Sequence, residues 1–364
     1  MYRTSLLAGG CSWLSPLHRW PNGPIYCRMS YKINSYVNVC LALAACCLLT
    51  ISAAHADSDD MQSYYQALQP ALSNNVFGIP VYLQSNDQNQ TMQGAVYGVI
   101  DQPFADVKHA LTSMQAWCDI VPQHLNVKAC TFERLANQCQ VSFYSGRKYY
   151  EKAEDAYQLR YRFAVTRADP SYFQTVLTAD KGPMGTRDYR IEVEAIPITE
   201  QRTFLRFSYA YRYNFLTTLG MQSYLSTLGS GKIGFSVTAT GAQGKPVYVD
   251  GVRGIIERNT IRYFLAIQSY LDTEQLPADK RFSARSNHWF ELTERFPQQL
   301  HALGKHDYLE YKQHEHADQL RLQKQLLPPC TLPTAQTEVA ASGEESPTFL
   351  HRTKTTPPTA GCEC

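Results

Sequence analysis

Three stretches near the middle of the chain alternate strictly between apolar or aromatic residues and polar ones. They are YQLRYRFAVT (157–166), YRIEVEAI (189–196) and TFLRFSYAYRY (203–213). Successive side chains of a β-strand point to opposite faces, so each stretch predicts a strand with one covered face and one face in water. Such alternation is typical of antiparallel sheets. The connections PITEQ and KGPMGT are short, so strands that follow one another in sequence are expected to pair.

The segments around these strands complete an α+β pattern. Residues 81–101 form two extended runs around an Asn/Asp/Gln-rich turn and predict a first hairpin. Apolar residues at helical spacing follow Pro103 and stop at Pro122, which predicts one broken helix or two short ones. Residues 252–273 carry an apolar stripe at spacings of three and four and form the longest predicted amphipathic helix. The apolar face of this helix needs a partner, and we expect the sheet to provide it.

Further helical segments and a tail flank this central part. Residues 57–77 predict a short helix interrupted near Pro70, and a more polar helical stretch is expected from about Asn287 to Lys324, broken at Pro297. The chain beyond Leu327 is rich in Pro, Thr, Ser and Ala, which predicts disorder. We therefore expect an N-terminal helical segment at 57–77, a main domain at 78–272, a helical extension at 273–326 and a tail at 327–364.

The N-terminus has the organisation of a secretory signal peptide. Arg28 and Lys32 precede an apolar run at 39–51, which ends in Ala54-His55-Ala56. A run of about 13 residues is too short for a bilayer that needs roughly 20. We expect cleavage after Ala56 and a periplasmic or secreted location in a bacterium, with residues 1–28 an over-long start ahead of Met29. Leu43-Ala44-Ala45-Cys46 also fits a lipoprotein processing site, which is the minor alternative.

The charge balance argues against a nucleic-acid partner. The 364-residue chain holds 34 Lys or Arg and 32 Asp or Glu, and the basic residues of the leader have no acidic counterpart. The exported chain is therefore slightly acidic and has no basic stripe of the kind that binds phosphate backbones.

The cysteines that remain after the leader are expected to form disulfides where geometry allows, because the protein is predicted to be exported. They are Cys118, Cys130, Cys139, Cys330, Cys362 and Cys364. Cys130 and Cys139 flank TFERLANQ, which reads as a hairpin between neighbouring strands, so this pair is our first prediction. Cys118 with Cys130 is the rival pairing.

The hexapeptide GSGKIG (229–234) has the G-x-G-x-x-G spacing of nucleotide-binding loops. Such a loop needs a strand before it and a helix after it, because the amides of the helix N-terminus meet the phosphate. Here the strand-like IGFSVTAT (233–240) follows the glycines, so the order is reversed. We interpret the glycines as a flexible lead into the last strand, and we predict no nucleotide or other cofactor.

Few residues are candidates for acid–base catalysis. Asp119 and His124 lie near the broken helix, and Glu257 with Arg258 lies on the long helix. A general base must reach the substrate inside a cavity. We instead expect His124 to bond backbone at a strand start, and Glu257 and Arg258 to form a solvated or sheet-edge ion pair.

The segment HEHAD is the one candidate for a metal site. On a helix, His316 points away from His314 and Asp318, so the three side chains do not converge. No metal site is predicted.

The order of these elements resembles the START-related (SRPBCC) superfamily. Its helix-grip fold wraps a curved antiparallel sheet around a long C-terminal helix and leaves a cavity between them. The resemblance covers roughly residues 78–272. The phrases that carry it resemble those of uncharacterised exported bacterial members of the superfamily. They are VYGVIDQPFADVKHAL, WCDIVPQHLNVKAC, GTRDYRIEVEA, KIGFSV and GVRGIIERNTIRYFLAI. The superfamily includes lipid and sterol carriers, hormone receptors and aromatic-polyketide cyclases. The many tyrosines here imply a cavity that is narrow or polar-rimmed.

The resemblance implies a ligand site between the covered face of the sheet and the long helix. Cavities lined by aromatic side chains with a few hydroxyls are typical of small-molecule sites. Gly182, Met184 and Gly185 in KGPMGT are expected to form a lid over the mouth. The predicted wall consists of Tyr161, Tyr189, Phe207, Tyr209, Tyr211, Ile256 and Tyr263.

We therefore expect an exported protein that binds or carries a hydrophobic, lipid-like molecule, in a role compatible with transient membrane contact, and that is not an enzyme. One alternative is a cyclase or lyase that uses the same cavity and places a buried carboxylate or histidine in it. Another is a structural or interaction protein whose tyrosines fill the cavity. The sequence leaves the oligomeric state open.

Overall fold

The computed structural model describes residues 58–214 and 231–326. The chain divides into two units, 1–55 and 56–364. The expected signal peptide, Cys46 and the tail at 327–364 lie outside the described residues, as does the start of the GSGKIG segment.

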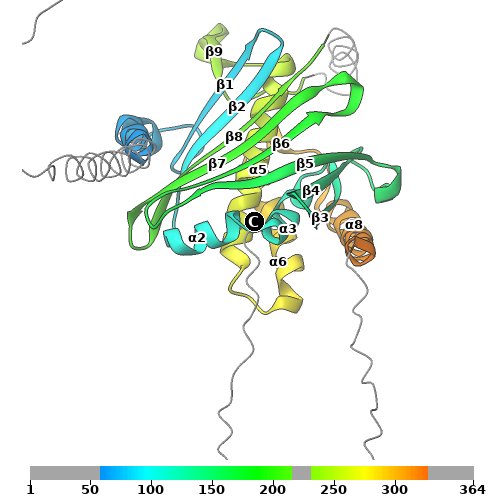
Figure 1. Cartoon of the computed structure of the whole chain (residues 1–364). Coiled ribbons are helices and arrows are strands. Elements are labelled where there is room, and N and C mark those ends of the chain that lie inside the picture. The colour runs from blue at the N-terminus through cyan, green and yellow to red at the C-terminus, as the bar shows by residue number, and fades with distance from the viewer. Residues whose placement is uncertain (1–57, 215–230, 327–364) are drawn as a thin grey trace, which may run out of the picture. The chain divides into compact units, whose positions relative to one another are not determined.

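The main structure is an eight-stranded antiparallel sheet with the strand order β1-β2-β8-β7-β6-β5-β4-β3 (Figure 1). Strands that follow one another pair, with one exception: β2 pairs with β8 instead of β3, which joins the first hairpin to the last strand of the sheet. The three alternating runs form β5, β7 and β8, as predicted. The strands are β1 Val81–Gln88, β2 Thr91–Ile100, β3 Val127–Leu135, β4 Gln138–Ser145, β5 Tyr157–Ala168, β6 Phe173–Lys181, β7 Arg187–Thr199 and β8 Arg202–Arg212.

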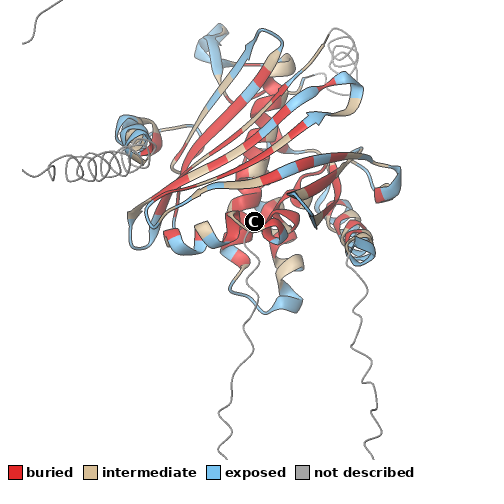
Figure 2. Cartoon of the chain, viewed as in Figure 1, coloured by how far each residue is buried: buried red, intermediate tan, exposed pale blue. Residues whose placement is uncertain are grey.

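Burial follows the alternation along each strand (Figure 2). On β5, Leu159, Tyr161 and Phe163 are buried, whereas Arg160 and Arg162 are exposed. The outer face is not entirely in water, since a helix over residues 58–73 covers Ala95, Tyr97, Val99 and Phe204 with Met61 and Leu72. This helix continues through Pro70, where we expected an interruption.

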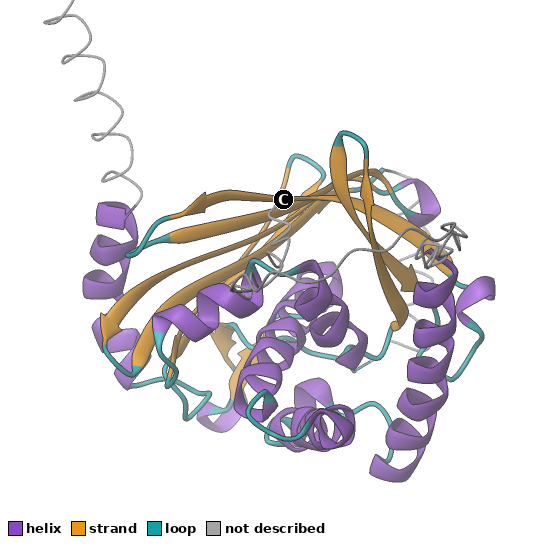
Figure 3. Cartoon of the chain, turned by 60° about the horizontal axis from the view of Figure 1, so that its bottom comes forward, coloured by secondary structure: helices purple, strands orange, loops and turns teal. Residues whose placement is uncertain are grey.

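Apart from the helix at 58–73, the helices gather on the inner side of the curved sheet (Figure 3). The broken pair is confirmed as α2 Phe104–Leu111 and α3 Met114–Ile120, and the long helix as α5 Gly251–Thr273. Two glycines of β2 let α5 approach the sheet closely. A Cβ added at Gly94 would overlap the Thr260 hydroxyl, and one at Gly98 would overlap the Phe264 ring. The structure is therefore the predicted α+β helix-grip arrangement, with a curved sheet around a late helix.

The segment after residue 231 differs from our prediction. The strand at 233–240 is not part of the main sheet. β9 Val237–Thr240 pairs with β10 Pro246–Tyr248 in a separate hairpin. The backbone N–H groups of Phe235 and Ser236 donate to the Glu257 carboxylate, 2.7 and 2.9 Å away, so they are not available for strand pairing.

The helical extension consists of α6 Ala278–Glu294, α7 Pro297–Leu300 and α8 Lys305–Leu326. Helix α6 begins earlier than the expected start near Asn287, directly after Pro277. It packs on α5, where the Trp289 indole N–H donates to the Arg262 carbonyl. Within 58–214 and 231–326, every helix is too short or too polar to cross a lipid bilayer.

Helix α8 lies along the edge strand β3 and satisfies its free backbone groups. Gln319 accepts a hydrogen bond from the Cys130 N–H and donates to the Cys118 carbonyl, each at 2.8 Å. Gln323 bonds both the N–H and the carbonyl of Phe132. Four helical residues rise about 6 Å and two strand residues about 6.6 Å, so the two repeats match along this edge.

A buried charge triad continues this stripe of polar contacts. The Glu315 carboxylate bonds the Lys128 and Lys312 ammonium groups at 2.7 Å each, and all three side chains are almost fully buried. The remaining ammonium protons donate to backbone carbonyls, those of Leu125 and Tyr149 for Lys128 and those of His124 and Val127 for Lys312.

The disulfide prediction was wrong in its first choice. Cys130 pairs with Cys118, the rival, with 4.8 Å between the Cα atoms. In the β3–β4 register Cys139 lies opposite Arg134 and Cys130 opposite Phe143, so the two cysteines of the hairpin do not face each other. Cys139 is also disulfide-bonded and is not a free thiol.

Candidate functional site: an aromatic wall beneath the sheet

Six of the seven predicted wall residues form one group of contacting rings on the inner face. Tyr189 of β7 stacks on Tyr211 of β8 with centroids 5.3 Å apart, and Tyr161 of β5 meets Tyr189 edge-on at 6.3 Å. Tyr209 contacts Tyr189, Tyr211 and, at 5.9 Å, Tyr263 of α5. Phe207 lies 5.8 Å from Tyr263. We call these six residues the aromatic wall.

Ile256, the seventh, borders the aromatic wall. Its side chain is fully buried and lies against Gly94 of β2. Gly94 is the cross-strand partner of Tyr209, so Ile256 continues the inner surface beside the Tyr209 ring.

Four tyrosine hydroxyls of the aromatic wall lack a hydrogen-bond partner in the described part of the chain. Tyr161, Tyr209, Tyr211 and Tyr263 donate no hydrogen bond to any described residue. In the described part of the chain, the fully buried side-chain oxygens that lack a partner belong to Thr131, Thr175 and Ser286. The four hydroxyls therefore retain accessible surface.

This accessible surface lies deep in the protein. Tyr209 and Tyr263 are only partly buried by surface area, yet desolvation by the surrounding protein raises the pKa of Tyr209 well above its usual range and also raises the pKa of Tyr263. Partial exposure and strong desolvation are compatible when the exposed part of each ring faces the interior of the protein rather than bulk water. Neighbouring tyrosines raise the pKa of Tyr209 further, so the phenols stay neutral.

The expected lid is the β6–β7 hairpin loop. The Tyr189 hydroxyl donates to Thr186 Oγ1 at 2.7 Å, which joins this loop to the aromatic wall. Met184 is exposed and has a φ of 56°, and Gly185 has a φ of 78°. Gly182 is not an open hinge, because an added Cβ would overlap the Tyr189 ring.

His124 is buried against the aromatic wall. Its imidazole stacks on Tyr263 with centroids 4.8 Å apart. Nδ1 accepts the backbone N–H of Asn126, so Nε2 carries the proton and donates to Asn259 Oδ1 at 3.3 Å. Burial, aided by the positive charge of Arg262, holds the pKa of His124 well below its usual range. The expected backbone-bonding role at the start of β3 is confirmed.

Glu257 and Arg258 do not form the solvated ion pair that we expected. The Glu257 carboxylate is fully buried and accepts the Phe235 and Ser236 N–H groups and the Ser85 hydroxyl. Arg258 donates to the Ile233 carbonyl. Adjacent helical residues point about 100° apart, so the two side chains leave α5 in different directions.

The other candidates for chemistry also make contacts within the protein. Asp119 pairs with Arg285 of α6 at 3.5 Å. His316 stacks on Phe282, whereas His314 lies near Tyr150, so the two histidines diverge as predicted. No group of three or more His, Cys, Asp or Glu side chains within the described ranges is arranged to hold a metal ion.

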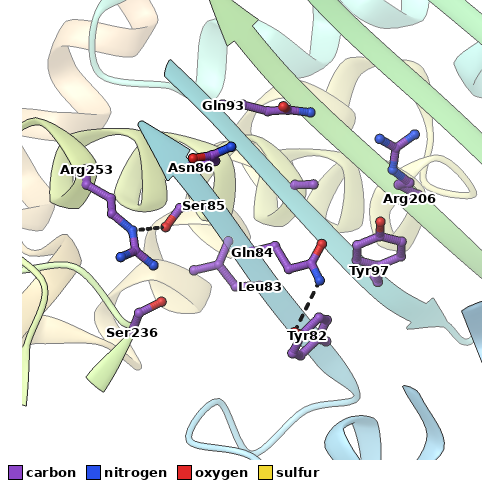
Figure 4. Close-up of a pocket in the computed structure, with 11 residues that line it drawn as sticks. Tyr82, Leu83, Gln84, Ser85, Asn86, Gln93, Tyr97, Arg206, Ser236 and Arg253 are labelled. Atoms are coloured by element: carbon purple, nitrogen blue, oxygen red, sulfur yellow. Dashed lines mark hydrogen bonds between the residues drawn. The ribbon is translucent and has the colours of Figure 1, made fainter. Parts of the chain in front are cut away.

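A groove of about 510 Å³ lies on the outer face and edge of β1 and β2 (Figure 4). Its lining is mostly polar and includes Gln84, Asn86 and Gln93. Arg253 reaches across it to the Ser85 hydroxyl at 2.7 Å. The groove is open to solvent and contains no member of the aromatic wall, so it is not the site that the sequence predicted.

Four basic side chains gather near His124, and of these only Arg258 was a candidate from the sequence. They are Lys148, Lys232, Arg258 and Arg262. We call them the basic cluster. They come from three separate segments of the chain, so no local motif could have revealed them.

Neither a protein-family model nor a curated protein matches this sequence. Solved structures with similar folds include a STAR-related lipid transfer protein from Xanthomonas axonopodis, with 10% identity, a TM-score of 0.33, and coverage of 55% of this chain and 96% of that one. An aromatase/cyclase from Streptomyces sp. R1128 has 12% identity, a TM-score of 0.27, and coverage of 55% and 94%. A conserved protein of unknown function from Enterococcus faecalis has 14% identity, a TM-score of 0.30, and coverage of 58% and 89%. Scores this low carry no argument about ligand or reaction.

Proposed function

We propose that this protein is an exported binding or carrier protein for a hydrophobic, lipid-like small molecule, held between the inner face of the sheet and α5. The observation that supports it is the set of four tyrosine hydroxyls, on rings deep inside the domain, that have no hydrogen-bond partner among residues 58–214 and 231–326. Aromatic surface with a few unpaired polar groups is what ligand pockets offer to a mostly apolar guest.

The energetics set a lower limit on the size of the ligand. Burial of about ten methylene groups contributes roughly 8 kcal/mol, at about 0.8 kcal/mol each. Association costs several kcal/mol of this, so a long alkyl chain or a ring system is needed for micromolar affinity.

Export is part of the proposal and is supported by two features. The N-terminal sequence has the charge, apolar run and A-x-A ending of a signal peptide. The Cys118–Cys130 disulfide suits an oxidising compartment such as the periplasm.

Binding is favoured over catalysis because His124 and Glu257, the two fully buried acid–base candidates near the inner face, already make hydrogen bonds within the protein. His124 uses one ring nitrogen as an acceptor and the other as a donor. The Glu257 carboxylate accepts three hydrogen bonds. Both ring nitrogens of His124 and both carboxylate oxygens of Glu257 are therefore engaged by the protein, whereas a general base must be within hydrogen-bond reach of the substrate.

The test is native mass spectrometry of the protein purified from the export compartment of its own host, followed by organic extraction. We expect a copurified hydrophobic molecule that is released by denaturation. A protein whose mass equals that of the mature chain, and that binds no alkyl probe, would instead favour the filled-cavity alternative.

A further inference from the structure

The basic cluster lies at the same end of the sheet as the β6–β7 loop. Arg212 at the end of β8 pairs with both Thr91 and Arg187, which places the β1–β2 turn and the β6–β7 loop together. β5 starts at Tyr157 and runs antiparallel to β6, so the β4–β5 loop that carries Lys148 lies at this end as well. Residues near the start of α5 reach the same end, because Ile256 lies against Gly94.

Backbone contacts hold three members of the basic cluster in place. Lys232 donates to the His301 carbonyl at 3.0 Å, Arg258 to the Ile233 carbonyl at 3.0 Å and Arg262 to the Leu300 carbonyl at 3.1 Å.

Lys148 is the distinctive member. Among the described residues its ammonium has neither an ion-pair nor a hydrogen-bond partner, although the side chain is half-buried. The charges that act on it are those of Arg262, Lys232 and Arg258, all positive, and together with burial they lower the pKa of Lys148 to about 8. The acidic residues in this region bind other groups. Glu151, on the same loop, accepts a hydrogen bond from the Arg147 N–H, and Glu315 forms ion pairs with Lys128 and Lys312.

The basic cluster is next to the aromatic wall. Arg262 and Lys148 are both close enough to His124 to lower its pKa, and His124 stacks on Tyr263. A half-buried cation surrounded by other cations is unfavourable unless a negative charge joins it. A negative charge at this point would relieve the repulsion among the basic side chains.

We propose that Lys148, with Lys232, Arg258 and Arg262, binds the anionic head group of the ligand, so that the ligand is a carboxylate or phosphate amphiphile rather than a neutral lipid. The inference rests on the proposed function, because the apolar part of the same molecule lies against the aromatic wall. The ammonium groups supply charge-assisted hydrogen bonds to such a head group, and the guanidinium groups add positive charge beside it.

Calorimetric titration with dodecanoate, dodecyl phosphate and dodecanol tests this inference. We expect the two anions to bind at least about tenfold more tightly than dodecanol. Lys148→Gln is expected to weaken the anions by about tenfold and to leave dodecanol unchanged, whereas Lys148→Arg retains most of the affinity. Lys280→Gln, a change of an exposed lysine on α6, is the matched control and should have no effect.

The outcomes separate the two proposals. Equal affinity for dodecanoate and dodecanol, unchanged by Lys148→Gln, would overturn the head-group assignment and leave the carrier function in place. Binding of none of the three probes would overturn both. Inorganic phosphate that binds as tightly as dodecyl phosphate would make the basic cluster a site for a free anion and would contradict the amphiphile.

Discussion

The His124 imidazole lies nearly parallel to the Tyr263 ring, with an interplanar angle of 21° and centroids 4.8 Å apart. This contact joins the turn before β3 to the face of α5 that contributes Tyr263 to the aromatic wall. The contact also keeps the His124 imidazole buried, where its protonated form is poorly solvated. The stability of the folded protein should therefore depend on pH.

We expect stability to fall as the pH drops through about 6.5. The pKa of His124 is well below its usual value in the folded state and is ordinary in the unfolded state, so the unfolded chain takes up this proton first. The free energy of unfolding then decreases by up to about 1.4 kcal/mol per pH unit. Urea unfolding between about pH 7.5 and about pH 5.5 should show a smaller slope for His124→Gln, and the exposed His306→Gln should match the parent protein. An unchanged slope in His124→Gln would contradict this account.

Gly94 permits the close packing of α5 on β2. Gly94→Ala places a methyl group on the Thr260 hydroxyl and is expected to cost about 1–3 kcal/mol of unfolding free energy. In a Thr260→Ala background the same change should cost clearly less, because the overlapping atom has been removed. Gly304→Ala, where the nearest neighbouring atom is 4.0 Å from the added Cβ, is the control. If the losses of unfolding free energy from Gly94→Ala and Thr260→Ala simply add in the double variant, the overlap with the Thr260 hydroxyl is not the cause of the loss.

Glu315 neutralises two buried ammonium groups. Glu315→Gln leaves Lys128 and Lys312 facing each other without a carboxylate, and we expect a loss of about 3–5 kcal/mol in chemical denaturation. Glu310→Gln changes an exposed residue of the same helix and should cost little. A loss of similar size in both variants would mean that the triad is not the cause.

The Cys118–Cys130 disulfide joins α3 to the edge strand. Cys118→Ser is expected to lower the free energy of unfolding by about 3 kcal/mol, and the double variant Cys118→Ser/Cys130→Ser by no more than a further small amount. Variants are preferable to a reductant, because Cys139 is disulfide-bonded as well. Peptide mapping without reduction should recover the Cys118–Cys130 pair, and a Cys130–Cys139 peptide would refute the assignment.

Anion binding should weaken at alkaline pH. The pKa of Lys148 is about 8, so its ammonium group loses its charge progressively as the pH rises above neutrality, whereas the arginines stay charged. Dodecanoate affinity is expected to decrease between about pH 7 and about pH 9 and to depend less on pH in Lys148→Arg. Dodecanol provides the comparison, since its affinity should not change over this range.

The sequence was sufficient for the sheet, the broken helix pair and α5, because period-two and helical patterns report burial on one face directly. It also identified the aromatic wall, since alternation assigns Tyr209 and Tyr211 to the same face as Phe207. Contacts between distant segments were not predictable in this way. The Cys118–Cys130 pair depends on how α3 docks on β3, and the burial of Glu257 depends on the path of residues 233–236.

The basic cluster and the polar stripe of α8 were missed for a related reason. Gln319 and Gln323 look like ordinary surface residues of a polar helix, and their role follows only from the strand beside them. The sequence around Lys148 contains no motif that indicates its role, because the basic residues near it come from α5 and from the segment that precedes α5. A sequence pattern shows which face of a helix or strand is buried. A site whose residues come from several segments can be recognised only from the packed structure.

The coverage of β3 by α8 has a consequence for self-association. An exposed edge strand invites another chain to add to the sheet and start aggregation. The side-chain amides of Gln319 and Gln323 occupy backbone groups of Cys130 and Phe132 that such a strand would use. Growth of the sheet from this edge would first require α8 to detach, so the last helix protects the protein against polymerisation through β3.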